Sequence, residues 1–385
     1  MFMEVSISIV IFSVFALILW RLNSIKKPHR NTNTRANNTS VQYRATKSNI
    51  ARTDNSLASE FTEKVTKEFN VDDVELPKEF NSLELIKTDI NNKEQQQVIE
   101  EICRGFRKPH PLLLPLTQKA FEPNELFDLI KSDPQITAKV LNRVNSSAFA
   151  LKQPITSINH AIIYLGIGTV KNIAMHFAVE NEVKFESNIQ QNAYQKLWSA
   201  SYLASSLGLL FAKELLLDDA SDISTRCLLN YLGDMAILST HPELAPSYNE
   251  QKALYQRVSD HQSQLNINTQ IIGSKLARYW QLPRTLVRSI ENNLSFLAAT
   301  PASETNDINE NEQVKYQVCY IACRLADLAV INEKSCLETI RYDLNKQLDF
   351  YYLFKNEQQP KVKQLLNLFH DMSFSKKVNS LLLIN

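Results

Sequence analysis

The spacing of hydrophobic residues along most of this 385-residue chain is that of α-helices. In SDPQITAKVLNRVNSSAF, apolar residues recur three or four positions apart and form one stripe along a predicted helix. Asp133 and Pro134 stand at its start, and this pair suits an N-cap followed by the first helical position. The stripe consists of Ile136, Val140, Leu141 and Val144.

Two further helices are predicted in ITSINHAIIYLGIGTVKNIAMHFAV. Thr156 or Ser157 can cap the first helix, and Gly166 suits the position just after its end. The apolar residues of the second helix are Val170, Ile173, Ala174 and Phe177.

A helix, a glycine-containing turn and a second helix also occur in DNA-binding proteins. Here the second helix offers only Lys171, Asn172 and His176 as polar groups, and it lacks a cluster of basic residues for phosphates. Nucleic acid is therefore not expected as a partner.

The N-terminus carries an uncharged apolar run, VSISIVIFSVFALILW, that neighbouring apolar residues extend to about 20 residues, the length of a membrane span. Trp20 suits the membrane interface. A cleavable signal peptide is the alternative, but Glu4 precedes the run, no Lys or Arg does, and no small-residue cleavage pattern follows. The pattern favours an uncleaved anchor at residues 1–22.

Residues 21–53 contain Lys and Arg but no Asp or Glu. The positive-inside rule then predicts a single-pass protein whose C-terminal domain lies in the cytoplasm. This stretch is rich in Asn and Thr and poor in aliphatic residues, so it is expected to be a flexible basic linker, with contact to anionic headgroups as a further role.

Composition supports an all-α fold. The chain has only 6 glycines, and turn dipeptides are scarce. A formal net charge of +1 gives no general reason to expect nucleic acid. The 5 cysteines are scattered and lie mostly in apolar runs, as reduced core thiols of a cytosolic protein do. Cys319 and Cys323 have the spacing of half a metal site, but no nearby Cys or His completes it.

Five stretches resemble the HDOD family, a bacterial signalling output domain related to HD-type metal phosphohydrolases: DPQITAKVLNRVNSSAF, ITSINHAIIYLGIGTVKNIA, LWSASYLAS, LLNYLGDMAIL and IGSKLARYWQLPRTLVRSIENN. The resemblance implies a helical subdomain packed on an HD-type helical bundle in a bacterial signalling protein. With the predicted anchor, the expected location is the bacterial inner membrane. The predicted organisation is an anchor at 1–22, a linker at 23–56, accessory helices at 57–108, the HDOD domain at 109–331 and a C-terminal helical extension at 332–385.

The resemblance also implies that the metal site is degenerate. Where HD hydrolases carry adjacent His and Asp, this chain has Asn230 and Tyr231, which are poor ligands for a divalent metal at neutral pH. Ala200 and Asn292-Asn293 stand at other positions where relatives carry His. Asp327 alone matches a ligand, and it is expected to bond to a neighbouring amide or to Arg324.

No His pair with metal spacing, nucleotide-binding loop or nucleophile elbow occurs in the sequence, so no catalytic residue, metal or cofactor is predicted. The polar residues at the former site form either a closed internal network or a ligand pocket. The network is favoured because no basic residue is evident there to hold a phosphate.

The leading hypothesis is a membrane-tethered, non-catalytic interaction module that binds a signalling protein. The alternatives are a metal-dependent phosphohydrolase or cyclic dinucleotide phosphodiesterase with substitute ligands, and a nucleotide-binding receptor. The extension, whose aromatic residues near Phe350 are costly to expose, is either a dimerising element of a homodimer or a lid on the core.

Overall fold

Helices are the regular secondary structure of the computed structural model, and no strand occurs among its described residues. These are residues 76–106, 109–118, 120–146, 149, 151, 153–180, 183–298, 309–334, 337, 348–356 and 359–382. The predicted all-α fold is thus confirmed. The predicted anchor, the linker, the accessory segment before residue 76 and Cys336 lie outside the described residues. Within these residues, no helix combines the length and the hydrophobicity needed to cross a bilayer.

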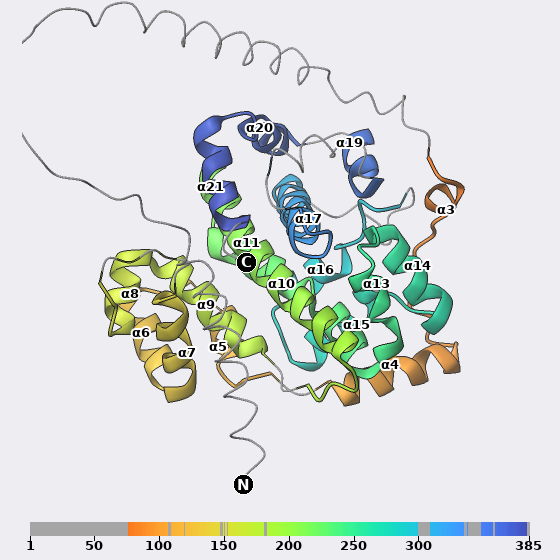
Figure 1. The fold of residues 1–385 in the computed structure, drawn as a ribbon, viewed down its shortest axis with the longest axis horizontal. Coiled ribbons are helices and arrows are strands. Elements are labelled where there is room, and N and C mark those ends of the chain that lie inside the picture. The colour runs from red at the N-terminus through yellow and green to blue at the C-terminus, as the bar shows by residue number, and fades with distance from the viewer. Residues whose placement is uncertain are drawn as a thin grey trace, which may run out of the picture. The chain divides into compact units, whose positions relative to one another are not determined.

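Helices α5 to α9 form a layer that packs on α10 and α11 of the central bundle, whereas α4 packs on α12 and α15 (Figure 1). In this layer α7 and α8 both contact α6 and α9, and α9 also contacts α10 and α11. The bounds are α3 Lys78–Asn81, α4 Lys93–Gly105, α5 Leu113–Gln118, α6 Pro123–Lys131, α7 Pro134–Val144, α8 Ile158–Leu165 and α9 Ile167–Val179.

The predicted helix signals of this layer are confirmed. The Asp133 carboxylate accepts a hydrogen bond from the Ile136 amide at 2.8 Å, and Pro134 is the first residue of α7. Of the two candidate caps of α8, Ser157 accepts from the His160 amide at 3.2 Å. Gly166 separates α8 from α9 with a φ of 84°, which a residue with a Cβ rarely adopts.

The second helix of the predicted helix, turn, helix pair turns its polar residues inward. Lys171, Asn172 and His176 of α9 are all buried. Asn172 accepts a hydrogen bond from Ser205 of α10, and Lys171 donates to Ser221 at 3.3 Å. These side chains therefore join the first layer to the bundle.

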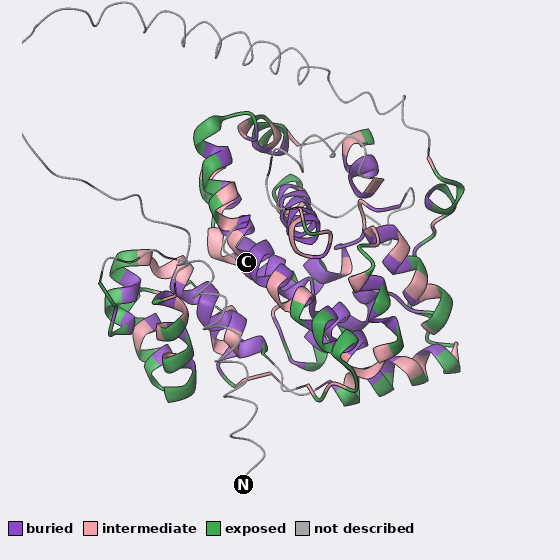
Figure 2. Ribbon diagram, in the orientation of Figure 1, coloured by how far each residue is buried: buried purple, intermediate pink, exposed green. Residues whose placement is uncertain are grey.

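The central bundle is built around α10, which packs against α11, α12, α13 and α17. Figure 2 shows buried residues along most of α10 and α17, whereas the outer faces of α6, α7 and α8 are exposed. The helices are α10 Asn188–Glu214, α11 Ala220–Leu229, α12 Leu232–Thr240, α13 Pro246–Asn249, α14 Leu254–Leu265, α15 Thr269–Tyr279, α16 Arg284–Glu291 and α17 Glu310–Val330, with a 3-10 helix, η3, at Pro242–Leu244.

Gly233, in the middle of LLNYLGDMAIL, allows α12 and α15 to touch. A Cβ at this position would lie 2.0 Å from the carbonyl oxygen of Thr269. Gly273 lies on the other side of the same contact, since its Cβ would lie 3.2 Å from the amide nitrogen of Gly233. The glycine in this apolar stretch is thus explained by a close helix crossing.

The C-terminal extension covers the chain's own core. Its described helices are the 3-10 helix η5 Leu348–Phe350, α19 Tyr351–Lys355, α20 Pro360–Leu368 and α21 Met372–Leu382. α20 packs on α17 and α21 on α10, where Phe369 and Phe374 contact the Phe211 ring. Phe350, Tyr351 and Tyr352 are buried, as expected from the cost of exposing them.

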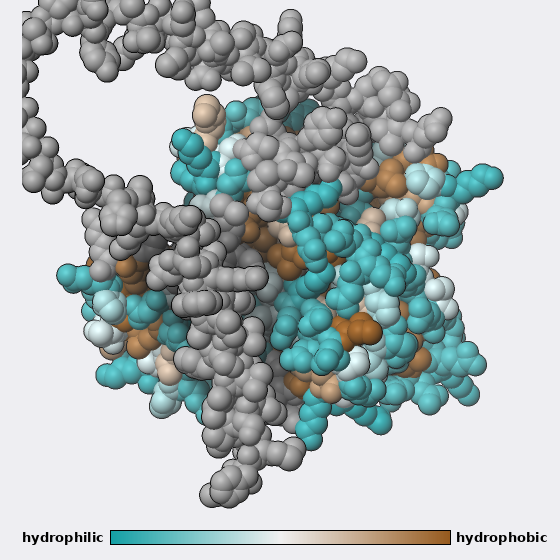
Figure 3. Space-filling model, in the orientation of Figure 1, coloured by the Kyte–Doolittle hydropathy of each residue, from teal (hydrophilic) through white to brown (hydrophobic). Residues whose placement is uncertain are grey.

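The face drawn in Figure 3 is mainly hydrophilic, and the hydrophobic side chains of its described residues lie in separate small groups. The large exposed hydrophobic residues are likewise distributed along the chain: Ile90, Ile163, Tyr164, Ile189, Leu216, Tyr279 and Met372. Single exposed residues of this kind are normal on a soluble surface.

Candidate functional site

Tyr231 and Asp327, two of the predicted site residues, are in direct contact. Tyr231 lies between α11 and α12, and its hydroxyl reaches Asp327 Oδ1 at 2.8 Å and the Cys323 carbonyl at 2.9 Å. Burial and the Asp327 charge raise the pKa of Tyr231 well above its ordinary value. The hydroxyl therefore remains a proton donor to α17 at neutral pH.

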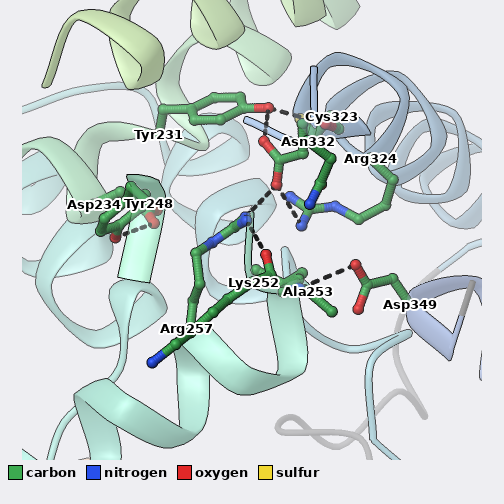
Figure 4. A network of polar contacts seen from close by, with 12 residues as sticks. Tyr231, Asp234, Tyr248, Lys252, Ala253, Arg257, Cys323, Arg324, Asn332 and Asp349 are labelled. Atoms are coloured by element: carbon green, nitrogen blue, oxygen red, sulfur yellow. Dashed lines mark hydrogen bonds and ion pairs between the residues drawn. The ribbon is translucent and has the colours of Figure 1, made fainter. Parts of the chain in front are cut away.

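Two buried arginines complete the surroundings of Asp327. Arg257 of α14 forms an ion pair with Asp327 Oδ2, and Arg324 of α17 approaches the same oxygen at 2.9 Å. Figure 4 shows Tyr231, Arg257 and Arg324 pointing toward one another from separate elements. Burial is the largest single influence and opposes the charge of both arginines, but Asp327 and the other nearby acidic groups together outweigh it and raise their pKa values.

These contacts correct one expectation and confirm another. The expectation that no basic residue lies among the predicted site residues is wrong, because Arg257 and Arg324 are buried beside Asp327. Arg257 comes from a stretch, YQRVSDHQ, outside the motifs that carry the family resemblance. The expected contact between Asp327 and Arg324 is confirmed.

Asn230 and Asn293 border a small cavity beside this network. Asn293 Nδ2 donates to the Asn230 carbonyl at 3.2 Å, and Asn230 Nδ2 reaches Cys323 Sγ at 3.8 Å. Their side-chain oxygens are buried and have no partner in the described part of the chain. The cavity measures about 10 Å³, space for about one water molecule. It is lined by Asn230, Tyr231, Asp234, Leu254, Arg257, Thr269, Asn293, Leu294, Arg324 and Asp327.

Asn292 and Ala200, the other two predicted site positions, do not line this cavity. The Asn292 amide donates to the Arg288 carbonyl at 2.8 Å, within the end of its own helix, and Asn292 does not line the cavity. Ala200 is fully buried in α10 and has no polar side-chain atom. The tertiary structure thus brings Asn230, Tyr231, Asn293 and Asp327 together and leaves Ala200 and Asn292 apart.

A second polar chain adjoins the cavity. Tyr248 donates to Asp234 Oδ1 at 2.9 Å, and its oxygen lies 3.2 Å from His261 Nε2. Burial raises the pKa of Asp234 to about 6, although Arg257 acts against this shift. Burial and Arg257 lower the pKa of His261 to about 3, so His261 is neutral at physiological pH.

The N-terminus of α14 forms another wall of the site. The Asp349 carboxylate accepts from the backbone amides of Leu254 at 3.1 Å and Tyr255 at 3.4 Å. Asp349 comes from η5 in the C-terminal extension, and Figure 4 shows its side chain directed at the start of α14. Tyr320 of α17 donates to the Asp349 carbonyl and so holds the segment in place.

The donor set of this site is unsuited to a divalent metal. Asp327 is the only carboxylate at the predicted ligand positions, and two guanidinium groups and a hydroxyl already contact it. In the described part of the chain, no three His, Cys, Asp or Glu side chains are grouped as a metal ion requires. Cys319 and Cys323 are buried free thiols whose sulfurs face the Ile223 and Cys227 carbonyls.

Sequence reasoning missed Arg257, Tyr248, His261 and Asp349. One signal was present: Leu254, Val258 and His261 share a helical spacing, and Arg257 lies three residues after Leu254 on the same buried face of α14. An arginine on such a face requires a buried anionic partner. No comparable signal existed for Asp349, since only the tertiary structure brings η5 to α14.

Comparison with known proteins identifies the domain. The family model described as HDOD domain matches residues 111–295, inside the predicted 109–331. None of the curated proteins matches the chain.

The solved structures that match this chain share little sequence with it. An HDOD domain protein of unknown function from Geobacter sulfurreducens is 16% identical, with 86% of this chain and 99% of that chain covered and a TM-score of 0.45. A Shewanella amazonensis protein described as a "Putative phosphohydrolase" is 15% identical. The match covers 75% of this chain and 98% of that chain, with a TM-score of 0.46. The MmoQ response regulator of Methylococcus capsulatus is 15% identical. The match covers 70% of this chain and 96% of that chain, with a TM-score of 0.34.

Proposed function

Because residues 111–295 of this chain form an HDOD domain, we propose that the protein is a membrane-tethered, non-catalytic interaction module of a bacterial signalling pathway. Its partner is a signalling protein that binds the cytoplasmic domain.

The environment of Asp327 carries the non-catalytic part of this proposal. A divalent ion at Asp327 would have to displace Arg257, Arg324 or Tyr231, and each displaced group would be left buried without its partner. Breaking a buried ion pair in this way costs roughly 3–5 kcal/mol. Of the other polar groups that line the cavity, Asn230 and Asn293 are neutral amides, and the Asp234 carboxylate already accepts from Tyr248, so they compensate poorly for this loss.

The N-terminal sequence supports the tether. The apolar run before Arg21 has the length of a membrane span, and the basic residues that follow it favour a cytoplasmic location for the domain. About 30 residues of Asn- and Thr-rich linker would give the domain reach from the inner membrane.

The burial of the polar residues of α9 supports a protein partner over nucleic acid. Lys171, Asn172 and His176 are the groups that a recognition helix would present to DNA, and all three face the interior.

Metal analysis of the full-length chain, purified in detergent, tests the proposal. We expect no stoichiometric manganese, iron or zinc and no hydrolysis of a phosphodiester. The double variant Asn230→His, Tyr231→Asp restores the residues that HD hydrolases carry at this position. We expect it to remain metal-free as well, because Arg257 and Arg324 still occupy Asp327. Stoichiometric metal with phosphodiester turnover in the unaltered chain would overturn the proposal.

Affinity purification from native membranes, followed by mass spectrometry, tests the partner. A signalling protein should co-purify with the full-length chain and also with the double variant, because the surface is unchanged. Purification of the chain alone, under conditions that preserve known membrane complexes, would contradict the interaction role.

A further inference from the structure

We propose that the N-terminus of α14, together with Arg257 and Arg324, forms a binding site for a soluble phosphate-bearing anion, and that Asp349 occupies this site as an internal substitute for the ligand. The site would give the signalling module a chemical input. Since it rests on the proposed non-catalytic function, the ligand is bound and not cleaved.

The first observation is the position of Asp349. The residue is 7% exposed, and its carboxylate accepts from two successive amides, those of Leu254 and Tyr255, at the start of a 12-residue helix. The first amides of a helix point toward an anion, and the helix dipole favours negative charge there. Asp349 thus places a carboxylate where a phosphate group would be stabilised.

The second observation is an unused set of buried donors beside this helix end. The Nε–H groups of Arg257 and Arg324 are buried without a partner among the described residues, and both side chains line the same cavity as Leu254. A buried N–H without a partner is costly unless a ligand or water fills the place. These groups point to a ligand independently of the helix end.

The third observation concerns charge. Arg257 and Arg324 share one carboxylate, Asp327. Burial raises the pKa of Asp349, whereas Arg324, the Leu254 amide and Arg257 act against this shift by favouring its ionised form. Asp234 faces the site from α12, where Tyr248 holds it. Removal of Asp349 alone would leave the two guanidinium groups with less compensating charge, so an incoming anion restores the balance that Asp349 provides.

The origin of Asp349 makes it a replaceable occupant. η5 and α19 are short helices outside residues 111–295, and they attach through an aromatic cluster in which Phe80 contacts Tyr351 and Tyr352. With Asp349 bound to the Leu254 amide, the cavity that Leu254 lines has space for about one water molecule. The ligand therefore enters only when η5 leaves the end of α14.

The donors select a phosphate-bearing ligand. Two helix amides and two guanidinium groups meet an anion that has several acceptor oxygens, and guanidinium binds phosphate through paired hydrogen bonds. Inorganic pyrophosphate is a suitable probe because it carries this chemistry without a base or sugar.

The variant Asp349→Asn tests the proposal in the full-length chain. It preserves the size of the side chain and removes the competing charge, so pyrophosphate should bind at least tenfold more tightly than to the unaltered chain in calorimetry. Adding Arg324→Gln to this variant should abolish the increase in affinity for pyrophosphate. The matched control is Asp371→Asn, since Asp371 also accepts from a backbone amide, that of Phe374 at 2.7 Å, but belongs to the start of α21. It should bind pyrophosphate as the unaltered chain does.

A second measurement on the unaltered chain covers the case in which the variant does not fold. Millimolar pyrophosphate should increase hydrogen exchange of the amides of residues 348–355, because the ligand displaces the segment. The proposal would be overturned if folded Asp349→Asn did not bind pyrophosphate, or if the Asp371→Asn control bound it as tightly as Asp349→Asn does. Unchanged hydrogen exchange of residues 348–355 in the unaltered chain would overturn it as well. None of these results would alter the metal content or partner binding that test the proposed function.

Discussion

At the scale of single residues, the most consequential group is Asp327. It is 3% exposed and is the common partner of Tyr231, Arg257 and Arg324, which come from three separate elements. Such a network is destabilised far more by loss of its central charge than by loss of one neutral donor.

Replacement of Asp327 by Asn should therefore lower the free energy of unfolding by roughly 3–5 kcal/mol, because two buried guanidinium groups lose their anionic partner. Tyr231→Phe removes only a hydroxyl and should cost roughly 1–2 kcal/mol. Denaturant unfolding of both variants measures the difference. An Asp327→Asn chain as stable as Tyr231→Phe would show that the ion pairs contribute little.

Asp234 should make stability depend on pH. Its pKa rises from 3.8 to about 6 in the folded chain, so folding favours the protonated form. The stabilisation that comes from protonated Asp234 is complete below about pH 4 and is lost as pH rises through about 6. The free energy of unfolding should change by roughly 3 kcal/mol over this range.

The difference in unfolding free energy between the unaltered chain and Asp234→Asn, measured from about pH 4 to pH 7, isolates this effect. The lowered pKa of His261 acts on both proteins and cancels to first order. The unaltered chain should lose stability relative to the variant as pH rises. A constant difference would contradict the raised pKa.

At the scale of elements, the crossing of α12 and α15 depends on contact between their backbones. Gly233 meets the Thr269 carbonyl, and Gly273 meets Gly233 and a methyl group of Ile290. Because Asn230 and Tyr231 directly precede α12, this crossing also positions one side of the cavity.

Gly233→Ala should consequently destabilise the chain by roughly 1–3 kcal/mol or more, since the new Cβ meets backbone that has to move. Gly168→Ala is the matched control. Its nearest neighbour is a side-chain methyl of Leu209 at 3.3 Å, and alanine has the better helix propensity. Melting temperatures should fall for the first variant and stay equal or rise for the second; equal shifts would contradict the close crossing.

At the scale of the whole molecule, the proposed tether orients the domain. Alkaline phosphatase fused after residue 60 should be inactive in cells, because residues 23–385 are expected to lie in the reducing cytoplasm. The mature protein isolated from cells should still contain the apolar run, with an N-terminus before residue 20. An active fusion, or loss of residues 1–20 from the mature protein, would contradict the anchor.

The local sequence was sufficient to predict the helices and their ends. Asp133, Ser157 and Gly166 act as predicted because a cap or a positive φ depends on only a few neighbouring residues. The contact between Asp327 and Arg324 was also predictable, since residues three apart lie on one side of a helix.

The contacts that Arg257 and Asp349 make depend on the tertiary structure. Arg257 lies 70 positions from Asp327 along the chain, and Asp349 lies 95 positions from Leu254. The local sequence indicates that Arg257, on a buried helix face, needs an anionic partner, but it does not identify Asp327 as that partner, and it gives no signal for Asp349. By itself, the sequence predicted an all-α chain with an HDOD domain. Only the packing of α14, α17 and η5 decided that buried arginines meet Asp327 and that Asp349 lies at the start of α14, because long-range contacts set which charges meet.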